Sequence, residues 1–326
     1  MRKQILKIAP IVLSLILQGD SVPFAPVPKV PEMAYLSSQS SISTWEEQWE
    51  IAVYNHQTGE TMTLSMNTYL QGVIRGEMQG DYPMEALKAQ AVASRTYVYY
   101  LKNAGMQHPG GACVCTDHQC CQAWMAVDPD WLYYDRVREA VESTSGVVVT
   151  YEGAPIKAMY FASSGGHTED YAEVWNDLSY EYLQGVPSLN EQKYHFTDDV
   201  FMQEFSPWTL LSQLRNSGYA IRCDSAQILE NITNIRRSKT GRVLSLDVDG
   251  ITISGTDFRK ALGLRSTNFY FQQTAGGGVS IVTTGFGHGV GMSQSGAAAL
   301  AEEGYDYGKI LQYYYTGVTL EWMPFH

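Results

Sequence analysis

The chain has 326 residues, of which 44% are hydrophobic and 17% charged, and its formal net charge at pH 7 is −12. This length can bury the core of one large domain or of two smaller ones. The excess of 34 Asp and Glu over 22 Lys and Arg argues against a basic nucleic-acid groove, which needs clustered cations. The 22 Tyr, 7 Trp and 29 Gly suit uncharged, ring-shaped ligands such as sugars, although aromatic side chains also fill protein cores.

The first 20 residues are typical of an export signal. Basic residues precede an apolar run from Ile8 to Leu17. A bilayer span takes roughly 20 apolar residues, so this run is short for one, and no A-x-A cleavage site follows it. We expect a cleaved secretory signal or an uncleaved membrane anchor over residues 1–20, with a buried core helix as the alternative. A proline-rich linker then covers residues 21–45.

From residue 46 onward, hairpin and helix patterns follow one another. Alternating apolar residues predict a hairpin over 51–66, and i,i+4 apolar pairs predict a short helix over 67–78. A second helix is predicted to begin at Asp81 as its N-cap, with Pro83 in the first turn, and to run to about Asn103.

The C-terminal half shows the same mixture. Strands are predicted at 147–151 and 156–161, a hairpin at 243–254, and a last helix at 293–303. Because helices and hairpins are mixed without regular βαβ units, the predicted fold class is α+β, with antiparallel hairpins. The stretch 188–275 is a candidate for an inserted smaller lobe.

Four of the five cysteines fall within nine residues. The cluster and its flanking histidines are His108, Cys113, Cys115, His118, Cys120 and Cys121. Thiolates and imidazoles are the ligands that Zn²⁺ prefers, but there is no regular pair of C-x-x-C motifs. Two disulfides and free thiols therefore stay open as alternatives. The sequence argues against the familiar zinc proteases and deaminases, since H-E-x-x-H is absent and no P-C-x-x-C follows His167-Thr168-Glu169.

Glu77 stands at the C-terminal end of the first predicted helix. The free carbonyl groups at such an end disfavour a carboxylate and should raise the pKa of Glu77. A carboxyl that stays protonated near neutral pH is what a general acid for glycosidic cleavage requires. On position alone, a solvated helix-end glutamate is the alternative.

Two glycine-rich segments carry histidines: Ser163 to Thr168 follows a strand, and Gly285 to Gln294 opens a helix. Glycines at this density let a ligand approach backbone N–H groups closely. No Walker pattern or neighbouring lysine favours phosphate. Each loop is therefore either the wall of a binding site or a tight structural turn.

Together these segments resemble the stage II sporulation protein D family of peptidoglycan lytic transglycosylases, from about residue 45 to 322. The family's Glu-Met-Pro is matched by Glu77-Met78-Gln79, with Gln79 in place of proline. Its other motifs follow in order: E-A-L-K-A-Q-A-x-A-x-R-T-Y at 85–97, S-S-G-G-x-T at 163–168, L-G-L-R-S-T-x-F at 262–269, and G-x-G-H-G-V-G-M-S-Q-x-G-A at 285–297.

The resemblance implies that Glu77 is the catalytic acid/base that cleaves between N-acetylmuramic acid and N-acetylglucosamine and leaves a 1,6-anhydro end. One carboxyl would suffice because the attacking C6 hydroxyl belongs to the substrate. A two-carboxylate hydrolase would need a second acid about 5–9 Å away, for which Asp81, Glu169 and Asp170 are candidates. The candidate substrate-binding residues are Lys88, Arg95, Tyr97, Ser163, Ser164, Gly165, Gly166, His167, Thr168, His288 and Gln294.

Some clostridial members of the family carry zinc on one His and two Cys. The similar segment here implies His108, Cys115 and Cys121 as ligands of a structural zinc, while Cys113 and Cys120 leave the choice of ligands open. Similar proteins work on glycan strands during engulfment with the amidase stage II sporulation protein P and the membrane protein stage II sporulation protein M.

The resemblance therefore implies an exported enzyme of endospore formation, at the outer face of the cytoplasmic membrane, with its catalytic domain over 46–326. A non-catalytic peptidoglycan-binding module of the same fold and a zinc-dependent cell-wall hydrolase are the alternatives. No nucleic acid is expected as a partner.

Overall fold

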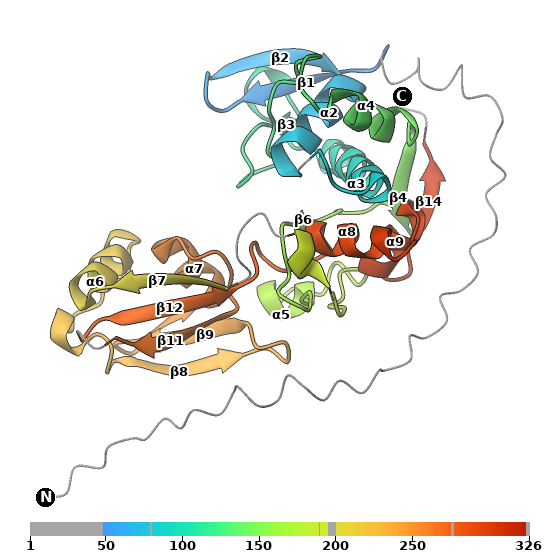
Figure 1. Cartoon of the computed structure of the whole chain (residues 1–326). Helices are drawn as coiled ribbons and strands as arrows, with labels where there is room; N and C mark the ends of the chain where they lie inside the picture. The colour runs from blue at the N-terminus through green and yellow to red at the C-terminus, as the bar shows by residue number, and fades with distance from the viewer. Residues whose placement is uncertain (1–47, 79, 189, 195–199, 275–276, 324–326) are drawn as a thin grey trace, which may run out of the picture. The chain divides into compact units, whose positions relative to one another are not determined.

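The computed structural model describes residues 48–78, 80–188, 190–194, 200–274 and 277–323 (Figure 1). The segments expected as export signal and linker, 1–20 and 21–45, lie outside the described residues, as does Gln79. Within the described ranges, no helix combines the length and the apolar character needed to cross a membrane.

The described chain begins with the predicted hairpin. Strands β1 (Glu50–Asn55) and β2 (Glu60–Ser65) pair antiparallel, and helix α2 (Met66–Glu77) follows at once. The side chain of Ser65 caps α2 by accepting the N–H of Thr68, and the backbone is extended at Met78. The sequence therefore placed this hairpin and the end of this helix correctly.

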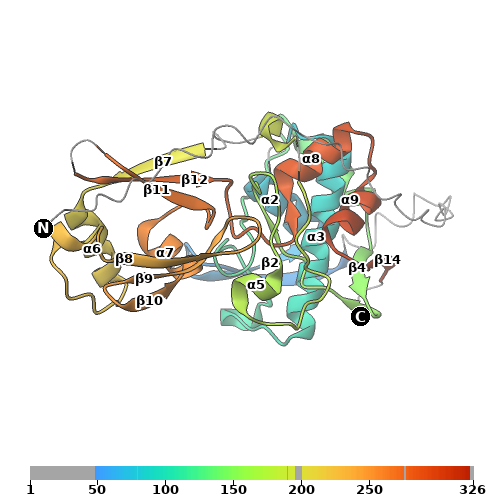
Figure 2. The same cartoon turned by 90° about the horizontal axis from the view of Figure 1, so that it is seen from below.

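Helix α3 (Met84–Asn103) lies at the centre of the first hydrophobic core. It contacts α2, α4 (Tyr134–Glu142), β4 (Val147–Tyr151), α8 (Gln294–Glu302) and α9 (Tyr307–Tyr314) (Figure 1). Figure 2 shows the same core from below. Its start differs from the prediction, because Pro83 and not Asp81 is the N-cap residue, with a non-helical ψ of 141°. A proline also disfavours helical backbone in the residue before it, which keeps the helix from reaching back to Asp81.

Strand β4 (Val147–Tyr151) has the predicted bounds and pairs antiparallel with β5 (Ala154–Pro155) and β14 (Thr319–Trp322). The strand predicted at 156–161 is regular only at β6 (Tyr160–Phe161), which pairs parallel with β13 (Met292–Ser293). The other short elements of this part are η1 (Pro109–Gly111), β3 (Val114–Cys115), α5 (Tyr171–Trp175) and η2 (Glu191–Tyr194).

Helix α8 (Gln294–Glu302) confirms the helix predicted over 293–303, with Ser293 as its N-cap. It is not the last helix, because α9 (Tyr307–Tyr314) follows, capped by the side chain of Asp306. Leu311 and Tyr314 of α9 are buried in the first core, so tertiary packing stabilises a segment that is too short to be stable as an isolated helix.

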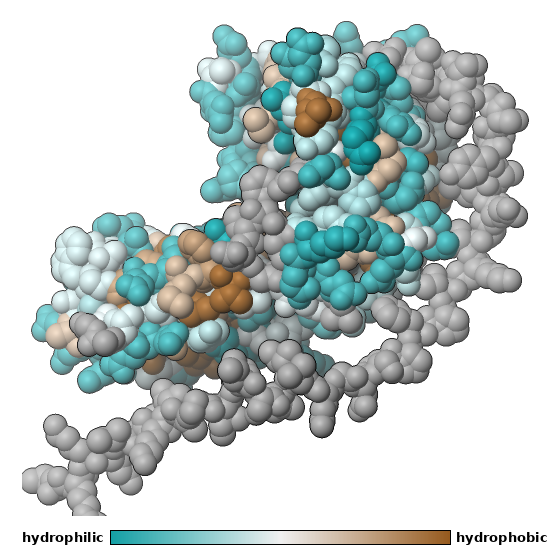
Figure 3. All heavy atoms as spheres, viewed as in Figure 1, coloured by the Kyte–Doolittle hydropathy of each residue, from teal (hydrophilic) through white to brown (hydrophobic). Residues whose placement is uncertain are grey.

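A second hydrophobic core gathers buried residues between Phe205 and Ile281. The elements around it are β7 (Val200–Phe205), α6 (Pro207–Asn216), η3 (Ser225–Gln227), β8 (Ile232–Arg237), β9 (Val243–Val248), β10 (Ile251–Ser254), α7 (Gly255–Leu262), β11 (Phe269–Gln273) and β12 (Val279–Thr284). The predicted β9–β10 hairpin is confirmed. Figure 3 shows apolar surface over the region of β7 and β12. Met202 of β7 and Tyr270 of β11 both pair with Val282 of β12, and both are about half exposed.

Helices and antiparallel sheets are thus mixed along the described chain, which confirms the predicted α+β class.

Candidate active site

Glu77, the last residue of α2, has a carboxyl with a strongly raised pKa. Burial raises the pKa of this carboxyl from 4.5 to about 7. Hydrogen bonds from the N–H of Ala123 (2.6 Å), from Tyr160 and from Gln294 favour the ionised form and offset part of that rise. The direction agrees with the prediction, but the main cause is burial rather than the carbonyl groups of the helix end.

Uncharged polar side chains surround this carboxyl. The Tyr160 hydroxyl lies 3.4 Å from Glu77 Oε1 and 2.9 Å from Gln122 Oε1. Gln294 donates to Gln90 at 3.3 Å as well as to Glu77. Of these residues the sequence pointed only to Gln294. Tyr160 and Gln122 stand in no chemical motif, and only the fold brings them to Glu77.

The segment that supplies the Ala123 N–H packs into a groove made by two glycines of α2. A Cβ on Gly72 would lie 2.1 Å from Trp124 Nε1, and a Cβ on Gly76 would lie 2.9 Å from the carbonyl carbon of Ala123. These glycines are four residues apart and therefore share one helix face. Any larger side chain there would push the segment away from Glu77.

The candidate second acids are engaged elsewhere. Glu169 accepts hydrogen bonds from Thr240 and from the N–H of Asp170, and Asp170 accepts the N–H of Gly185 at 2.7 Å. Asp81 is exposed. Among the described residues, none of the groups that shift the pKa of Glu77 is a second carboxyl.

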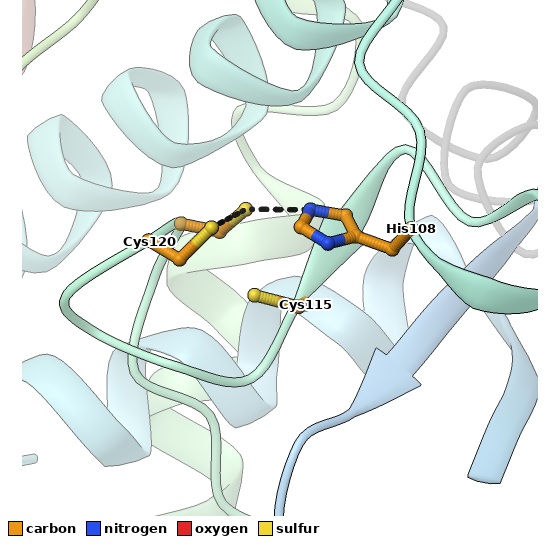
Figure 4. Close-up of side chains that lie close together, drawn as sticks. His108, Cys115 and Cys120 are labelled. Atoms are coloured by element: carbon orange, nitrogen blue, oxygen red, sulfur yellow. Dashed lines mark hydrogen bonds between the residues drawn. The ribbon is translucent and has the colours of Figure 1, made fainter. Parts of the chain in front are cut away.

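The cysteine cluster forms a second site. The ligand atoms of His108, Cys115, Cys120 and Cys121 all lie within 4.8 Å of one another, and Figure 4 shows the labelled side chains converging. Cys121 Sγ lies 3.3 Å from His108 Nε2 and 3.9 Å from Cys120 Sγ. Two sulfurs on one tetrahedral zinc lie roughly 3.7 Å apart, given Zn–S distances of about 2.3 Å. All five cysteines are free thiols, so the alternative of two disulfides is not observed.

Local structure brings these ligands together. β3 pairs parallel with β1 and places Cys115 beside Tyr54, whose ring lies parallel to that of His108 at 6.3 Å. The N–H groups of Cys120 and Cys121 both donate to the carbonyl of Asp117, which closes a turn. Three thiols and one imidazole are a donor set typical of structural zinc. The group includes the expected His108, Cys115 and Cys121, and adds Cys120, which the sequence left undecided.

Two expected substrate-binding residues of α3 make intramolecular contacts. Lys88 pairs with Glu85 at 2.9 Å. Arg95 is fully buried and donates to the carbonyls of Val141 and Val147. The guanidinium of Arg95 thus ties α3 to α4 and to the first residue of β4.

The S-S-G-G loop also turns its polar groups inward. The hydroxyls of Ser163 and Ser164 and the N–H groups of Ser164 and Gly165 donate to the buried carboxylate of Glu191. The N–H of Gly166 donates to Ser164 Oγ. The sequence suggested that a ligand would meet these N–H groups, whereas an internal carboxylate occupies those of Ser164 and Gly165.

The remaining loop residues hold the backbone. His167 Nδ1 lies 2.6 Å from the carbonyl of Thr168, whose hydroxyl accepts the N–H of Val186. His288 Nδ1 accepts the N–H of Val290, so its Nε2 carries the proton and donates to the carbonyl of Tyr160. Burial lowers the pKa of His288 to about 3, which keeps the ring neutral.

Aromatic rings form a row that begins at Tyr97. This ring stacks on Tyr100 at 6.1 Å, and the hydroxyls of Tyr100 and Tyr180 lie 2.7 Å apart. Tyr171 contacts both Tyr180 (4.7 Å) and Trp175 (4.6 Å) through its ring. Trp175 is 37% exposed at the end of the row. Aromatic faces of this kind suit the apolar faces of sugar rings.

Comparison with known proteins gives a consistent result. The family profile described as "Stage II sporulation protein" matches residues 54–151. "Stage II sporulation protein D" of Bacillus subtilis is 31% identical over 283 residues, which cover 83% of this chain and 78% of that protein. The protein of the same name from Bacillus amyloliquefaciens is 31% identical over 287 residues, 84% and 79% of the two chains. The "Amidase enhancer" of Bacillus subtilis is 29% identical over 295 residues, 77% of this chain and 40% of that protein.

Proposed function

Because the chain belongs to the stage II sporulation protein D family, a family of sporulation cell-wall proteins, we propose that it is a peptidoglycan lytic transglycosylase. The observation that carries the proposal is the carboxyl of Glu77, whose pKa burial raises to about 7 within a shell of uncharged hydrogen-bond donors. Such a carboxyl is present in both protonation states near neutral pH, as acid/base catalysis requires.

In the proposed reaction, protonated Glu77 gives its proton to the oxygen between C1 of N-acetylmuramic acid and C4 of N-acetylglucosamine. The C1–O bond breaks, and the N-acetylglucosamine end leaves as an alcohol. The C6 hydroxyl of the muramic acid attacks C1 and gives its proton to the Glu77 carboxylate. The product carries a 1,6-anhydro ring, no water is consumed, and Glu77 regains its starting proton.

The hydrogen bonds around Glu77 support both half-reactions. Donation from Ala123 and Tyr160 stabilises the carboxylate that forms after the first proton transfer. Burial favours the protonated form and so restores the acid. Neither step needs a second carboxyl, which agrees with the engagement of Glu169 and Asp170 elsewhere.

We propose that His108, Cys115, Cys120 and Cys121 hold a zinc ion, which would supply a structural crosslink between β3 and the turn at residues 117–121. Gln122 and Ala123 follow that turn directly and contact Tyr160 and Glu77. The crosslink would thus steady the donors around the acid.

The biological setting is also proposed from family membership. Residues 1–20 would export or anchor the chain at the outer face of the cytoplasmic membrane, 21–45 would act as a linker, and 46–326 would form the catalytic domain, with a smaller lobe within it. Glycan strands would be the substrate during engulfment. The similarity to a protein named "Amidase enhancer" supports action beside an amidase such as stage II sporulation protein P, and stage II sporulation protein M is the proposed membrane partner.

Mass spectrometry of products from purified glycan strands tests the reaction. The wild type should release fragments that end in anhydro-muramic acid, one water lighter than hydrolysis products, and Glu77→Gln should release none. Asp170→Asn is the matched control, because the Asp170 carboxyl accepts the N–H of Gly185 and makes no hydrogen bond to Glu77. Anhydro products from Glu77→Gln would contradict the assignment of the acid.

The same assay separates the alternatives. Reducing ends instead of anhydro ends would indicate a hydrolase, and immediate loss of turnover on chelation, before any unfolding, would indicate a catalytic zinc. Binding to glycan without any cleavage by the wild type would indicate a non-catalytic binding module.

A further inference from the structure

Glu191 is a buried acid that no sequence motif singles out. It opens η2, is 1% exposed, and accepts hydrogen bonds from three consecutive residues of the S-S-G-G loop. Its Oε2 accepts from Ser163 Oγ (3.1 Å), Ser164 N (2.8 Å) and Gly165 N (3.2 Å), and its Oε1 accepts from Ser164 Oγ (2.8 Å). Four donors on one carboxylate are enough to compensate for its loss of hydration.

The backbone of the loop is shaped around this carboxylate. Successive N–H groups that converge on one anion form an anion-binding nest, and Gly165 has the positive φ, +72°, of the left-handed region. A Cβ on Gly165 would also lie 2.7 Å from Thr284 Cγ2. The conformation therefore depends on glycine and on the carboxylate together.

Glu191 is held in place from its other side. Gly296 of α8 lies so close that a Cβ there would be 2.9 Å from Glu191 Oε1. Arg242, the residue before β9, donates to the carbonyl of Ser164 at 2.8 Å, and its charge also interacts with that of Glu191. Within the described part of the chain, no basic side chain forms an ion pair with Glu191, so hydrogen bonds from the loop carry most of the compensation.

The loop lies between two parts of the proposed site. It follows β6, whose Tyr160 reaches Glu77. Ser163 exchanges both backbone hydrogen bonds with Phe286 of the second glycine-rich segment. Phe286 is 43% exposed and the S-S-G-G loop reaches the surface at Gly165 and Gly166, which are half-buried. A change in the loop would therefore alter the surface at Gly165, Gly166 and Phe286 without a direct contact to Glu77.

We propose that Glu191 is the positioning residue that holds the Ser163–Gly166 loop in its glycan-binding conformation, an inference that rests on the proposed function. Because Glu191 contacts the loop and not Glu77, affinity for glycan depends on it and proton transfer does not. Replacement by glutamine puts an amide NH₂ where the loop presents N–H donors, so like groups face each other and the nest opens.

The experiment compares Glu191→Gln with the wild type on glycan strands free of stem peptides. We expect KM to rise at least tenfold, while kcat changes less than threefold and the pH profile of kcat keeps its position. Glu302→Gln is the matched control, because that glutamate is exposed and pairs with Lys193, a residue of the same short helix η2 that Glu191 opens. It should leave KM unchanged.

Affinity is also measured without turnover, by calorimetric titration of the same glycan into Glu77→Gln and into the double variant that adds Glu191→Gln. We expect the double variant to bind at least tenfold more weakly. Equal binding, or a fall in kcat at constant KM, would overturn the inference. If Glu191→Gln does not fold, Glu191→Asp is used instead, because aspartate keeps the charge on a shorter side chain. It should raise KM by a smaller factor, and an unchanged KM for this variant would overturn the inference. Failure of the proposed function looks different, because the wild type itself would then not cleave.

Discussion

Replacing Glu77 by glutamine tests the electrostatics of the proposed acid through protein stability, independently of catalysis. In the folded chain, burial raises the pKa of Glu77 from 4.5 to about 7. A group with a raised folded-state pKa stabilises the fold fully below its unfolded pKa, and this contribution is lost as pH rises to the folded pKa. Glutamine has nearly the same size but cannot ionise, so the variant escapes this loss.

The size of the effect follows from the pKa. At about 1.4 kcal/mol per pKa unit, a rise from 4.5 to about 7 corresponds to about 3 kcal/mol lost by the wild type across that pH range. The free energy of unfolding of Glu77→Gln minus that of the wild type should therefore increase by about 3 kcal/mol from pH 4.5 to somewhat above pH 7, and then level off. Urea unfolding followed by tryptophan fluorescence, at closely spaced pH values, measures this difference.

Glu302→Gln supplies a control of opposite sign. Hydrogen bonds from Lys193 and Tyr194 lower the pKa of Glu302, so its contribution to stability is present above its ordinary pKa and is lost as pH falls. The stability difference for this variant should therefore fall as pH rises toward 4.5 and stay nearly constant above it. A difference for Glu77→Gln that stays constant between pH 4.5 and pH 7 would show that Glu77 ionises at its ordinary pKa, and would refute the reasoning.

Three further predictions concern the surroundings of Glu77. Gly76→Ala places a Cβ 2.9 Å from the backbone of Ala123, so it should lower the free energy of unfolding by about 1–3 kcal/mol and reduce glycan cleavage. Gly308→Ala in α9 has more room and should change neither quantity. Urea unfolding and product assays measure the two effects. Tyr160→Phe removes a hydrogen bond that favours ionised Glu77, so the alkaline limb of the pH–activity profile should move to higher pH. Removal of bound metal by a chelator should lower the Tm in differential scanning calorimetry by at least about 5 °C, and added Zn²⁺ should restore it.

The sequence predicted the elements whose signals are local. The β9–β10 hairpin turns at Asp249-Gly250, a pair suited to tight turns, and α2 ends where it was expected to end. Errors arose where one local signal competed with another. Asp81 is a good N-cap residue, but Pro83 takes the cap position of α3. Helix α9 was missed because its stability comes from burial of residues such as Tyr314 rather than from propensity.

The site was predictable only for residues that stand in motifs. The sequence offered Glu77 as the candidate acid and, through the family resemblance, His108, Cys115 and Cys121 as candidate zinc ligands, and the structure brings these three side chains together with Cys120. The pKa of Glu77 is raised, as predicted, but its main cause is burial of the carboxyl. Burial depends on the tertiary structure and cannot be inferred from the position of Glu77 at a helix end. Glu191 gives no signal at all, since its role depends on a loop 26 to 28 residues away in sequence.

Residues 121–123 link the cysteine cluster to the surroundings of Glu77. Cys121 belongs to the candidate metal-ligand group, Gln122 contacts Tyr160, and Ala123 donates to Glu77. The segment is fixed on one side by the turn at Asp117 and on the other by the groove that Gly72 and Gly76 leave on one face of α2. A donor held from both sides loses little entropy when Glu77 ionises, which is the preorganisation that a charge-stabilising donor requires. A structural metal at the cysteine cluster would then affect proton transfer through the position of one N–H group, without contacting the substrate.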